Sequence, residues 1–319
     1  MTFSVIIPLF NKAPHIAVAV SSALAQSLPP DEIIVVDDGS TDNGAAAVAN
    51  LTDRRIILIR QSNQGVSAAR NAGVAAARSS HVAFLDADDA WLPQHLETLH
   101  NLITLFPAAH LYSTMYEIHL GAVIFRPKSA YPYGFVGMVD DFFYRMAIGL
   151  SLVNSTTACI TRQAFDDVGG FPLNVKRGED LVFWMKLAQR FPVAHATIVT
   201  AIYNRDAVNR SVVLREQAAP GSLLYLQSII AARSLNATQL CSARSLFRQI
   251  AFYTAAGMRE AGDIGGLIAI RKLAGDMNMR GLMLKISLLA VMPRGILSLA
   301  RRFRHETSKR SAAPTEISA

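Results

Sequence analysis

Short apolar runs alternate with helical patterns along the first ninety residues of the chain. The runs, rich in Val, Ile, Leu and Phe, cover residues 3–7, 32–36, 56–59 and 82–85. Runs of this length and composition are typical of strands that are buried on both faces. Helical spacing falls between them, at residues 16–28, 44–50 and 65–78. This alternation predicts an α/β fold whose parallel sheet is built with right-handed crossovers, with Pro8 ending the first strand.

Polar residues follow these strands where each one ends. They are Asn11, Asp37, Asp38, Asp86 and Asp88. The carboxyl ends of parallel strands share one edge of a sheet, and ligands of open α/β sheets bind there. We therefore expect these side chains to line a binding site.

The last of these groups is an acidic cluster, Asp86, Asp88 and Asp89, directly after an apolar run. Carboxylates this close repel one another, and a cation between them removes the repulsion. Aspartate oxygens are hard ligands that suit Mg²⁺ or Mn²⁺. The alternative is an acidic turn that only caps the next helix, which the pattern predicts from Pro93 to about Leu105.

The middle of the chain predicts further elements of both kinds. Residues 110–125 are typical of a strand pair with Gly121 in or near its turn, and residues 155–161 of another strand. A short helix is expected at 162–167, a turn at 169–172 and a longer helix from Glu179 to about Arg190. Beyond residue 215 the pattern is helical, at 223–235, 238–257 and 266–274.

Composition limits the class of protein. The chain has 319 residues, 51% of them hydrophobic, which excludes a disordered chain and allows a large core. Its two cysteines, Cys159 and Cys241, have no metal-ligand spacing and favour a reducing cytosol. The first residues lack the basic region and cleavage site of a signal peptide. No uncharged apolar run reaches 18 residues, so we expect no spanning helix.

The net charge of +7 is concentrated near the C-terminus. Residues 271–310 hold ten Lys and Arg against two acids, so the rest of the chain is nearly neutral and a nucleic-acid-binding surface is not expected. Residues 281–304 are apolar on one side and basic on the other. Such a segment predicts a helix lying in the headgroup plane of an anionic membrane, or a core helix with a solvated basic tail.

Six motifs in order give the chain a family resemblance. They lie at residues 4–12, 22–26, 32–42, 63–73, 84–89 and 169–180, the last with Gly169-Gly170-Phe171 and Gly178-Glu179-Asp180. In these motifs the chain resembles the family 2 glycosyltransferases, which are inverting, nucleotide-sugar-dependent enzymes of the GT-A fold. The resemblance covers residues 3 to about 211.

The resemblance implies a GT-A type, Rossmann-like nucleotide-binding sheet with an acceptor-side extension and a helical C-terminal region. We expect a glycosyltransferase domain at 1–215, divided into a nucleotide-sugar-binding half at 1–92 and an acceptor half at 93–215. Residues 216–319 form the helical region, which includes the membrane-associating segment 281–304.

In the donor half, the resemblance implies a role for each motif. Asp38 accepts a hydrogen bond from the base, and the backbone near Pro8 lines the base pocket. Arg70 lies near the diphosphate, Asp86 near the ribose and Asp88 on Mg²⁺ or Mn²⁺. Asp89 is expected to cap a helix at Trp91. The alternatives are helix capping for Asp38 and a surface ion pair for Arg70.

In the acceptor half, the resemblance makes Asp180 the general base that deprotonates the acceptor hydroxyl. Glu179 and Trp184 are weaker acceptor-binding candidates. A Trp at such a position is more often a core residue than a sugar platform, and acids at a helix start are favoured by the helix dipole alone. Many family members carry a metal-binding His three residues after a Tyr that ends the last sheet strand. Here Asp206 follows Tyr203 at that spacing. An aspartate can also bind Mg²⁺ or Mn²⁺, so Asp206 is the candidate for the third metal ligand; the alternative is a loop residue.

The implied function is transfer of a sugar from a nucleotide donor, UDP-linked by analogy, to a hydroxyl of a saccharide or lipid-linked acceptor. Cell-surface polysaccharide, lipopolysaccharide or glycolipid synthesis would be the setting, at the cytoplasmic face of a membrane. The alternative is a catalytically silent sugar-nucleotide-binding or scaffold protein. A silent relative would be expected to lose Asp38, Asp88 or Asp180, and all of them are present.

Overall fold

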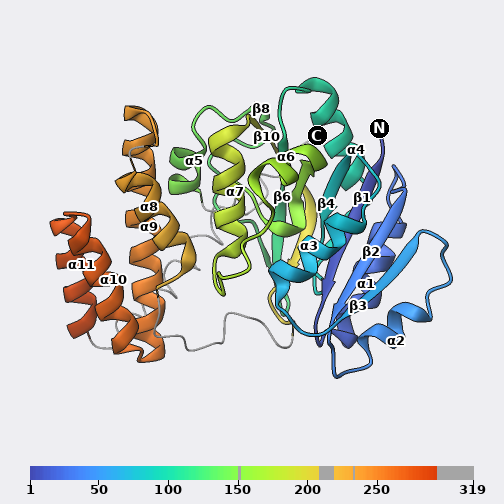
Figure 1. Cartoon of the computed structure of the whole chain (residues 1–319), viewed down its shortest axis with the longest axis horizontal. Helices are drawn as coiled ribbons and strands as arrows, with labels where there is room; N and C mark the ends of the chain where they lie inside the picture. Colours follow the sequence, from blue (N-terminus) through green and yellow to red (C-terminus); the bar gives the residue numbers. More distant parts are fainter. Residues whose placement is uncertain (150–151, 208–218, 233, 293–319) are drawn as a thin grey trace, which may run out of the picture. The chain divides into compact units, whose positions relative to one another are not determined.

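The computed structural model describes residues 1–149, 152–207, 219–232 and 234–292. The chain divides into two compact units, residues 1–210 and 211–319 (Figure 1). The first unit holds a ten-stranded sheet with helices on both faces, and the described part of the second is helical. The predicted division of the first unit into donor and acceptor halves at residue 92 stays a prediction.

The first four strands form the parallel half of the sheet. They are β1 (Phe3–Leu9), β2 (Glu32–Asp38), β3 (Ile56–Gln61) and β4 (His81–Phe84), in the order β3-β2-β1-β4. The helices between them are α1 (Ala13–Leu24), α2 (Gly44–Ala49) and α3 (Val66–Ala76). The sequence prediction of a parallel α/β sheet is therefore confirmed, although α1 ends at Leu24 rather than near residue 28.

Pro8 does not end β1, contrary to the sequence prediction, because the strand continues to Leu9. The Ile6 carbonyl accepts a hydrogen bond from the Leu85 N–H, so the polar backbone groups of Ile6 point toward β4. Pro8, two residues on, points the same way but lies beyond the end of β4 at Phe84. Its missing N–H therefore costs no sheet hydrogen bond.

The second half of the sheet is mixed. Its strands are β5 (Ala90–Trp91), β6 (Leu111–Leu120), β7 (Val123–Phe125), β8 (Val136–Met138), β9 (Ala158–Thr161) and β10 (Val193–Asn204). β9 runs antiparallel between β4 and β6, and β10 runs parallel to β6. The predicted strand pair at Gly121 is confirmed by β6 and β7. The run at 155–161 begins as a 3₁₀ turn, η1 (Ser155–Thr157), before it becomes β9.

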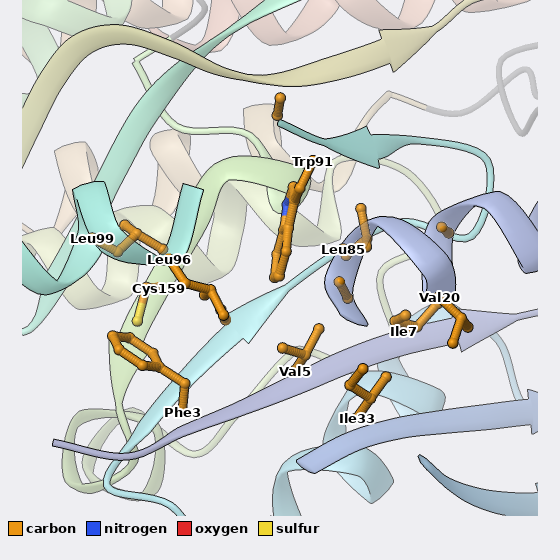
Figure 2. Packing of buried hydrophobic residues seen from close by; sticks show 14 of the residues in the cluster. Phe3, Val5, Ile7, Val20, Ile33, Leu85, Trp91, Leu96, Leu99 and Cys159 are labelled. Atoms are coloured by element: carbon orange, nitrogen blue, oxygen red, sulfur yellow. The ribbon is translucent and has the colours of Figure 1, made fainter. Parts of the chain in front are cut away.

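Helices cover both faces of this sheet. The remaining helices of the first unit are α4 (His95–Leu105), α5 (Phe142–Ile148), α6 (Arg162–Val168) and α7 (Glu179–Arg190). Along β1, Phe3, Val5 and Ile7 join one buried cluster with α1 and α4 residues, whose packing Figure 2 shows around Val20, Leu96 and Leu99. The opposite face packs on α3, where Gly73 lies against Ile6.

The described part of the second unit is helical, as the sequence predicts. Its helices are α8 (Gly221–Ala231), α9 (Ala237–Ala261), α10 (Ile264–Asp276) and α11 (Arg280–Val291). A capping box at Asn236 and Gln239 starts α9, and Gly262 in the left-handed conformation ends it. Among the described residues, no helix combines the length and apolar character needed to cross a bilayer.

Candidate functional site

The carboxyl edge of the parallel strands gathers the polar residues that the sequence places there. Asn11 follows β1 with a φ of 51°, a conformation that Asn tolerates better than most residues. Its side-chain oxygen accepts a hydrogen bond from the Thr41 N–H at 2.8 Å, and its own N–H donates to Ser40 at 3.0 Å. These bonds fasten the loop after β1 to the loop after β2.

Asp38 organises the loop before α3. One carboxylate oxygen accepts from the Gln61 amide at 2.7 Å and from the Gln64 N–H at 2.9 Å, and the other accepts from the Gly65 N–H at 2.8 Å. Asp38 is buried, so these bonds compensate for the loss of water. The alternative of Asp38 as a cap of α2 is wrong; the base-binding role predicted for Asp38 and Pro8 stays a prediction.

Arg70 on α3 connects the end of β4 with the start of α7. Its guanidinium donates to Asp86 at 2.8 Å and to Glu179 at 3.4 Å, and lies 5.3 Å from the centre of the Phe171 ring. The Arg70 side chain is only 4% exposed, so the alternative of a surface ion pair is wrong. The structure thus brings together three residues that the sequence predicts for the site.

The Arg70 guanidinium sits in strongly acidic surroundings. Burial opposes its charge, but the carboxylates of Asp86, Glu179 and Asp180 outweigh that effect and raise the pKa of Arg70. Its Nε is buried and has no hydrogen-bond partner among the described residues. Buried donors are normally paired, so this orphan donor is consistent with a site built to receive a ligand acceptor.

The two acids at the start of α7 hold their protons more strongly than ordinary carboxyls. Burial and the neighbouring Asp180 raise the pKa of Glu179 to about 7, against the opposing effect of Arg70. Burial also raises the pKa of Asp180, whose carboxylate accepts from the Leu181 N–H at 2.7 Å. Gly178, in the left-handed conformation, turns the chain into the helix so that both acids lie at its first turn.

Asp88, the predicted metal ligand, pairs with a residue that sequence reasoning did not select. The Lys12 ammonium lies 2.6 Å from the Asp88 carboxylate, and both side chains are mostly buried. Lys12 follows Asn11 at the end of β1, the edge where the site was expected. A basic residue at that position was the signal that could have identified it.

Asp89 does not cap a helix at Trp91, contrary to the sequence prediction. Trp91 belongs to strand β5, and α4 begins only at His95. Asp89 is buried, accepts from the Thr156 hydroxyl and accepts from the Asn204 N–H at 2.9 Å. Burial, with the nearby Asp86 charge, raises the pKa of Asp89 well above its usual value. Asp89 therefore joins the end of β4 to η1 and β10.

Trp184 is a core residue, which corrects its assignment as an acceptor contact. Its side chain is 1% exposed and packs edge-on against Phe84 and Phe171. A platform for a sugar needs an accessible ring face, and this ring has none. Helix α7 thus packs Trp184 against Phe84 of β4, while Glu179 in its first turn contacts Arg70.

The acids at this edge fit a cation that is shared with a ligand. Among the described residues, no group of three or more His, Cys, Asp or Glu side chains could hold a metal by itself. The Asp206 carboxylate accepts a hydrogen bond from the Gly121 N–H. Mg²⁺ is commonly bound by one or two carboxylates with substrate phosphates and water, a donor set that partly exposed Asp88 and Asp86 can begin. The ligand roles of Asp88 and Asp206 stay predictions.

Comparison with known proteins decides the family. The model of glycosyl transferase family 2 matches residues 4–168, just over half of the chain. The chain belongs to glycosyl transferase family 2. The match begins in β1 and ends with α6, so it includes Asp38, Arg70 and Asp88 but not α7.

Relatives in this family match only parts of the chain. An uncharacterized glycosyltransferase of Nostoc sp., alr2836, is 40% identical over 123 residues, which cover 38% of this chain and 37% of that protein. The Escherichia coli protein WfgD, a UDP-Glc:alpha-D-GlcNAc-diphosphoundecaprenol beta-1,3-glucosyltransferase, is 34% identical over 116 residues, which cover 36% of this chain and 46% of WfgD. The chain thus spans less than half the length of these relatives.

A solved structure of this fold matches nearly the whole chain. S. aureus TarS 1–349, in complex with UDP-GlcNAc, superposes with a TM-score of 0.71 over 95% of this chain and 88% of the TarS chain. At 19% identity, this likeness establishes the fold. It confirms the GT-A type fold with a helical C-terminal region that the sequence predicts.

Proposed function

We propose that this family 2 protein is an inverting glycosyltransferase that moves a sugar from a UDP-linked donor to a hydroxyl of a saccharide or lipid-linked acceptor. The observation that carries the proposal is the buried Arg70, which joins Asp86 at the end of β4 to Glu179 and Asp180 at the start of α7. The proposal takes Asp86 as a donor-side acid and Asp180 as the base, both acting on the charge of Arg70. The names of WfgD and TarS, with UDP-Glc and UDP-GlcNAc, support a UDP-sugar, and WfgD supports a lipid-diphosphate acceptor in cell-surface polysaccharide, lipopolysaccharide or glycolipid synthesis.

In the proposed reaction, Asp180 accepts the proton of the acceptor hydroxyl. The hydroxyl oxygen forms a bond to the anomeric carbon from the face opposite the diphosphate, and the bond from that carbon to the diphosphate oxygen breaks. Burial raises the pKa of Asp180, which makes its ionised form a better base than an exposed aspartate. The positive charge of Arg70 opposes this rise in the pKa of Asp180.

On the donor side, the proposal assigns base binding to Asp38 and the backbone at Pro8, and ribose binding to Asp86. The Gln61, Gln64 and Gly65 donors that fix Asp38 hold its carboxylate in one orientation. Mg²⁺ or Mn²⁺ on Asp88, with Asp206 as a proposed further ligand, would neutralise the charge of the departing nucleoside diphosphate.

A catalytically silent sugar-nucleotide-binding or scaffold protein is the second candidate. It would need the donor residues but not a general base at α7. The raised pKa of Asp180 beside Arg70 favours the enzyme, because a carboxyl that serves only as a helix cap gains nothing from burial among other acids.

The test is the Asp180→Asn variant, which keeps the shape of the side chain and removes its basicity. We expect kcat for sugar transfer, or for hydrolysis of the donor, to fall by about 100-fold or more. UDP affinity, measured by calorimetry, should stay nearly unchanged. The exposed Asp167→Asn on α6 is the matched control. Full turnover in Asp180→Asn would place the base elsewhere, and absence of any turnover in the native protein would favour the scaffold.

We further propose that the protein is peripheral on the cytoplasmic face of a membrane. Helix α11 buries Leu282, Ile286 and Leu289 on one side, so this side is core, as the alternative interpretation of the sequence expected. Its other side exposes Leu284, Leu288 and Val291. The basic residues of 293–304 lie outside the described part of the chain. An apolar stripe beside basic residues is the pattern of a helix at an anionic lipid surface.

A further inference from the structure

The carboxylate proposed to bind the metal is already neutralised by a cation of the chain itself. The Lys12 ammonium and the Asp88 carboxylate are 2.6 Å apart, with the two side chains 12% and 18% exposed. The neighbouring acid, Asp86, is paired in the same way with Arg70. Each of these acids at the end of β4 therefore faces a basic side chain from a different element.

The backbone of Lys12 is fixed at this position. Asn11 turns the chain after β1, and the Lys12 carbonyl then accepts from the N–H groups of His15 at 2.9 Å and Ile16 at 3.0 Å. The strands that precede Lys12 and Asp88 are neighbours in the sheet, with Ile6 of β1 opposite Phe84 of β4. The ion pair is thus built across two adjacent strand ends, where the fold holds both residues.

A divalent cation and an ammonium cannot both occupy the space in front of one carboxylate oxygen. We propose that Lys12 holds Asp88 until a divalent cation displaces it, and that the displaced ammonium then binds the diphosphate of the donor. Lys12 is therefore both a competitor of the metal and a ligand of the nucleotide. The inference rests on the proposed function, because it takes Asp88 as the metal ligand.

This exchange makes metal and nucleotide bind cooperatively. Displacing the ammonium from Asp88 leaves an unpaired charge in a largely buried site, which costs free energy unless another anion pairs with it. The diphosphate is that anion, so UDP lowers the cost of admitting the metal. By thermodynamic reciprocity, the metal strengthens UDP binding by the same factor.

The experiment measures Mn²⁺ binding by electron paramagnetic resonance of the free ion, without and with saturating UDP, in the full chain and in Lys12→Met. Without UDP, the methionine variant should bind Mn²⁺ about tenfold more tightly, because the competing charge is gone. The factor by which UDP increases the affinity for Mn²⁺ should be about tenfold smaller in Lys12→Met than in the native protein. Asp88→Ala should lose the Mn²⁺ site altogether.

Two controls separate this role from a structural one. Lys12→Arg keeps the positive charge and should retain most of the coupling between Mn²⁺ and UDP. The exposed Lys272→Met on α10 removes a charge of the second unit, which holds neither Lys12 nor Asp88, and should leave both constants unchanged. A Lys12→Met protein that binds Mn²⁺ no more tightly than the native protein, or keeps the native coupling, would overturn the inference while leaving the metal assignment intact. Absence of Mn²⁺ binding in the native protein would overturn both.

Discussion

At the scale of single residues, the site is defined by how its charges are balanced. Arg70 donates hydrogen bonds to Asp86 and Glu179 and also interacts electrostatically with Asp180. This cluster of four residues therefore contains three acids and one base. Burial and this excess of negative charge favour protonation of one acid and raise the pKa of Glu179 to about 7. A protonated Glu179 is a hydrogen-bond donor beside Asp180, the proposed base.

The raised pKa of Glu179 predicts how the stability of the protein depends on pH. The pKa of Glu179 rises from 4.5 to about 7 on folding. The stability that Glu179 contributes is therefore fully present below pH 4.5 and is lost as the pH rises through about 7. Glu179→Gln has no carboxyl group to ionise, so it is spared this loss. The stability of Glu179→Gln relative to the native protein should therefore be higher at pH 8 than at pH 5. Urea denaturation at both pH values measures this.

The exposed Glu97→Gln on α4 is the control for removing a carboxylate. A difference in stability between Glu179→Gln and the native protein that is the same at pH 5 and pH 8 would contradict the raised pKa of Glu179.

At the scale of elements, α3 is placed by its close packing on the sheet. Gly73 lies so near β1 that a Cβ atom would come within 2.5 Å of the Ile6 side chain and 3.3 Å of Val36. Arg70, one turn earlier on the same helix, reaches Asp86 and Glu179 from this position. The small residue therefore sets the distance between α3 and the acids of the site.

Gly73→Ala is expected to destabilise the protein by about 1–2 kcal/mol, because overpacking against a central strand outweighs the gain in helix propensity. Urea denaturation gives the free energy of unfolding. The control is Gly257→Ala on α9, where an added Cβ meets nothing within 4 Å and should be neutral or stabilising. Stabilisation by Gly73→Ala comparable to that control would mean that α3 shifts away from β1 at little cost.

At the scale of the whole molecule, the proposed membrane attachment depends on α11. Truncation before this helix would also remove Leu282, Ile286 and Leu289 from the core of the second unit. Substitution on the exposed side is the cleaner approach, because Leu284 is 62% exposed and Leu288 is 54% exposed.

The full chain is expected to co-sediment with vesicles of anionic lipid and not with vesicles of neutral lipid. Binding should weaken as salt rises through about 0.15 M, where the Debye length is about 8 Å. Leu284→Glu combined with Leu288→Glu should abolish sedimentation, whereas Leu105→Glu on α4, 62% exposed, should not. A native protein that stays in the supernatant with anionic vesicles would refute the membrane proposal.

The sequence by itself determined the four parallel strands, the β6–β7 pair, most of the helices and the edge on which the candidate site lies. Apolar runs such as residues 32–36 are short and β-branched, and their polar ends follow directly, so local pattern is sufficient to order β1 to β4. The acids Asp38, Asp86 and Asp88 were identified for the same reason. They stand immediately after strands, where neighbours along the chain reveal their position.

Only the tertiary structure decided which side chains meet. Lys12 and Asp88 are 76 residues apart, and Arg70 and Glu179 are 109 apart, so no local pattern pairs them. Strand β5 and the burial of Trp184 likewise depend on partners from β10 and the aromatic core. Pro8 continues β1 because β4 ends before reaching it. Charge pairing and burial depend on distances in space, and these are fixed only when the sheet brings remote strand ends together.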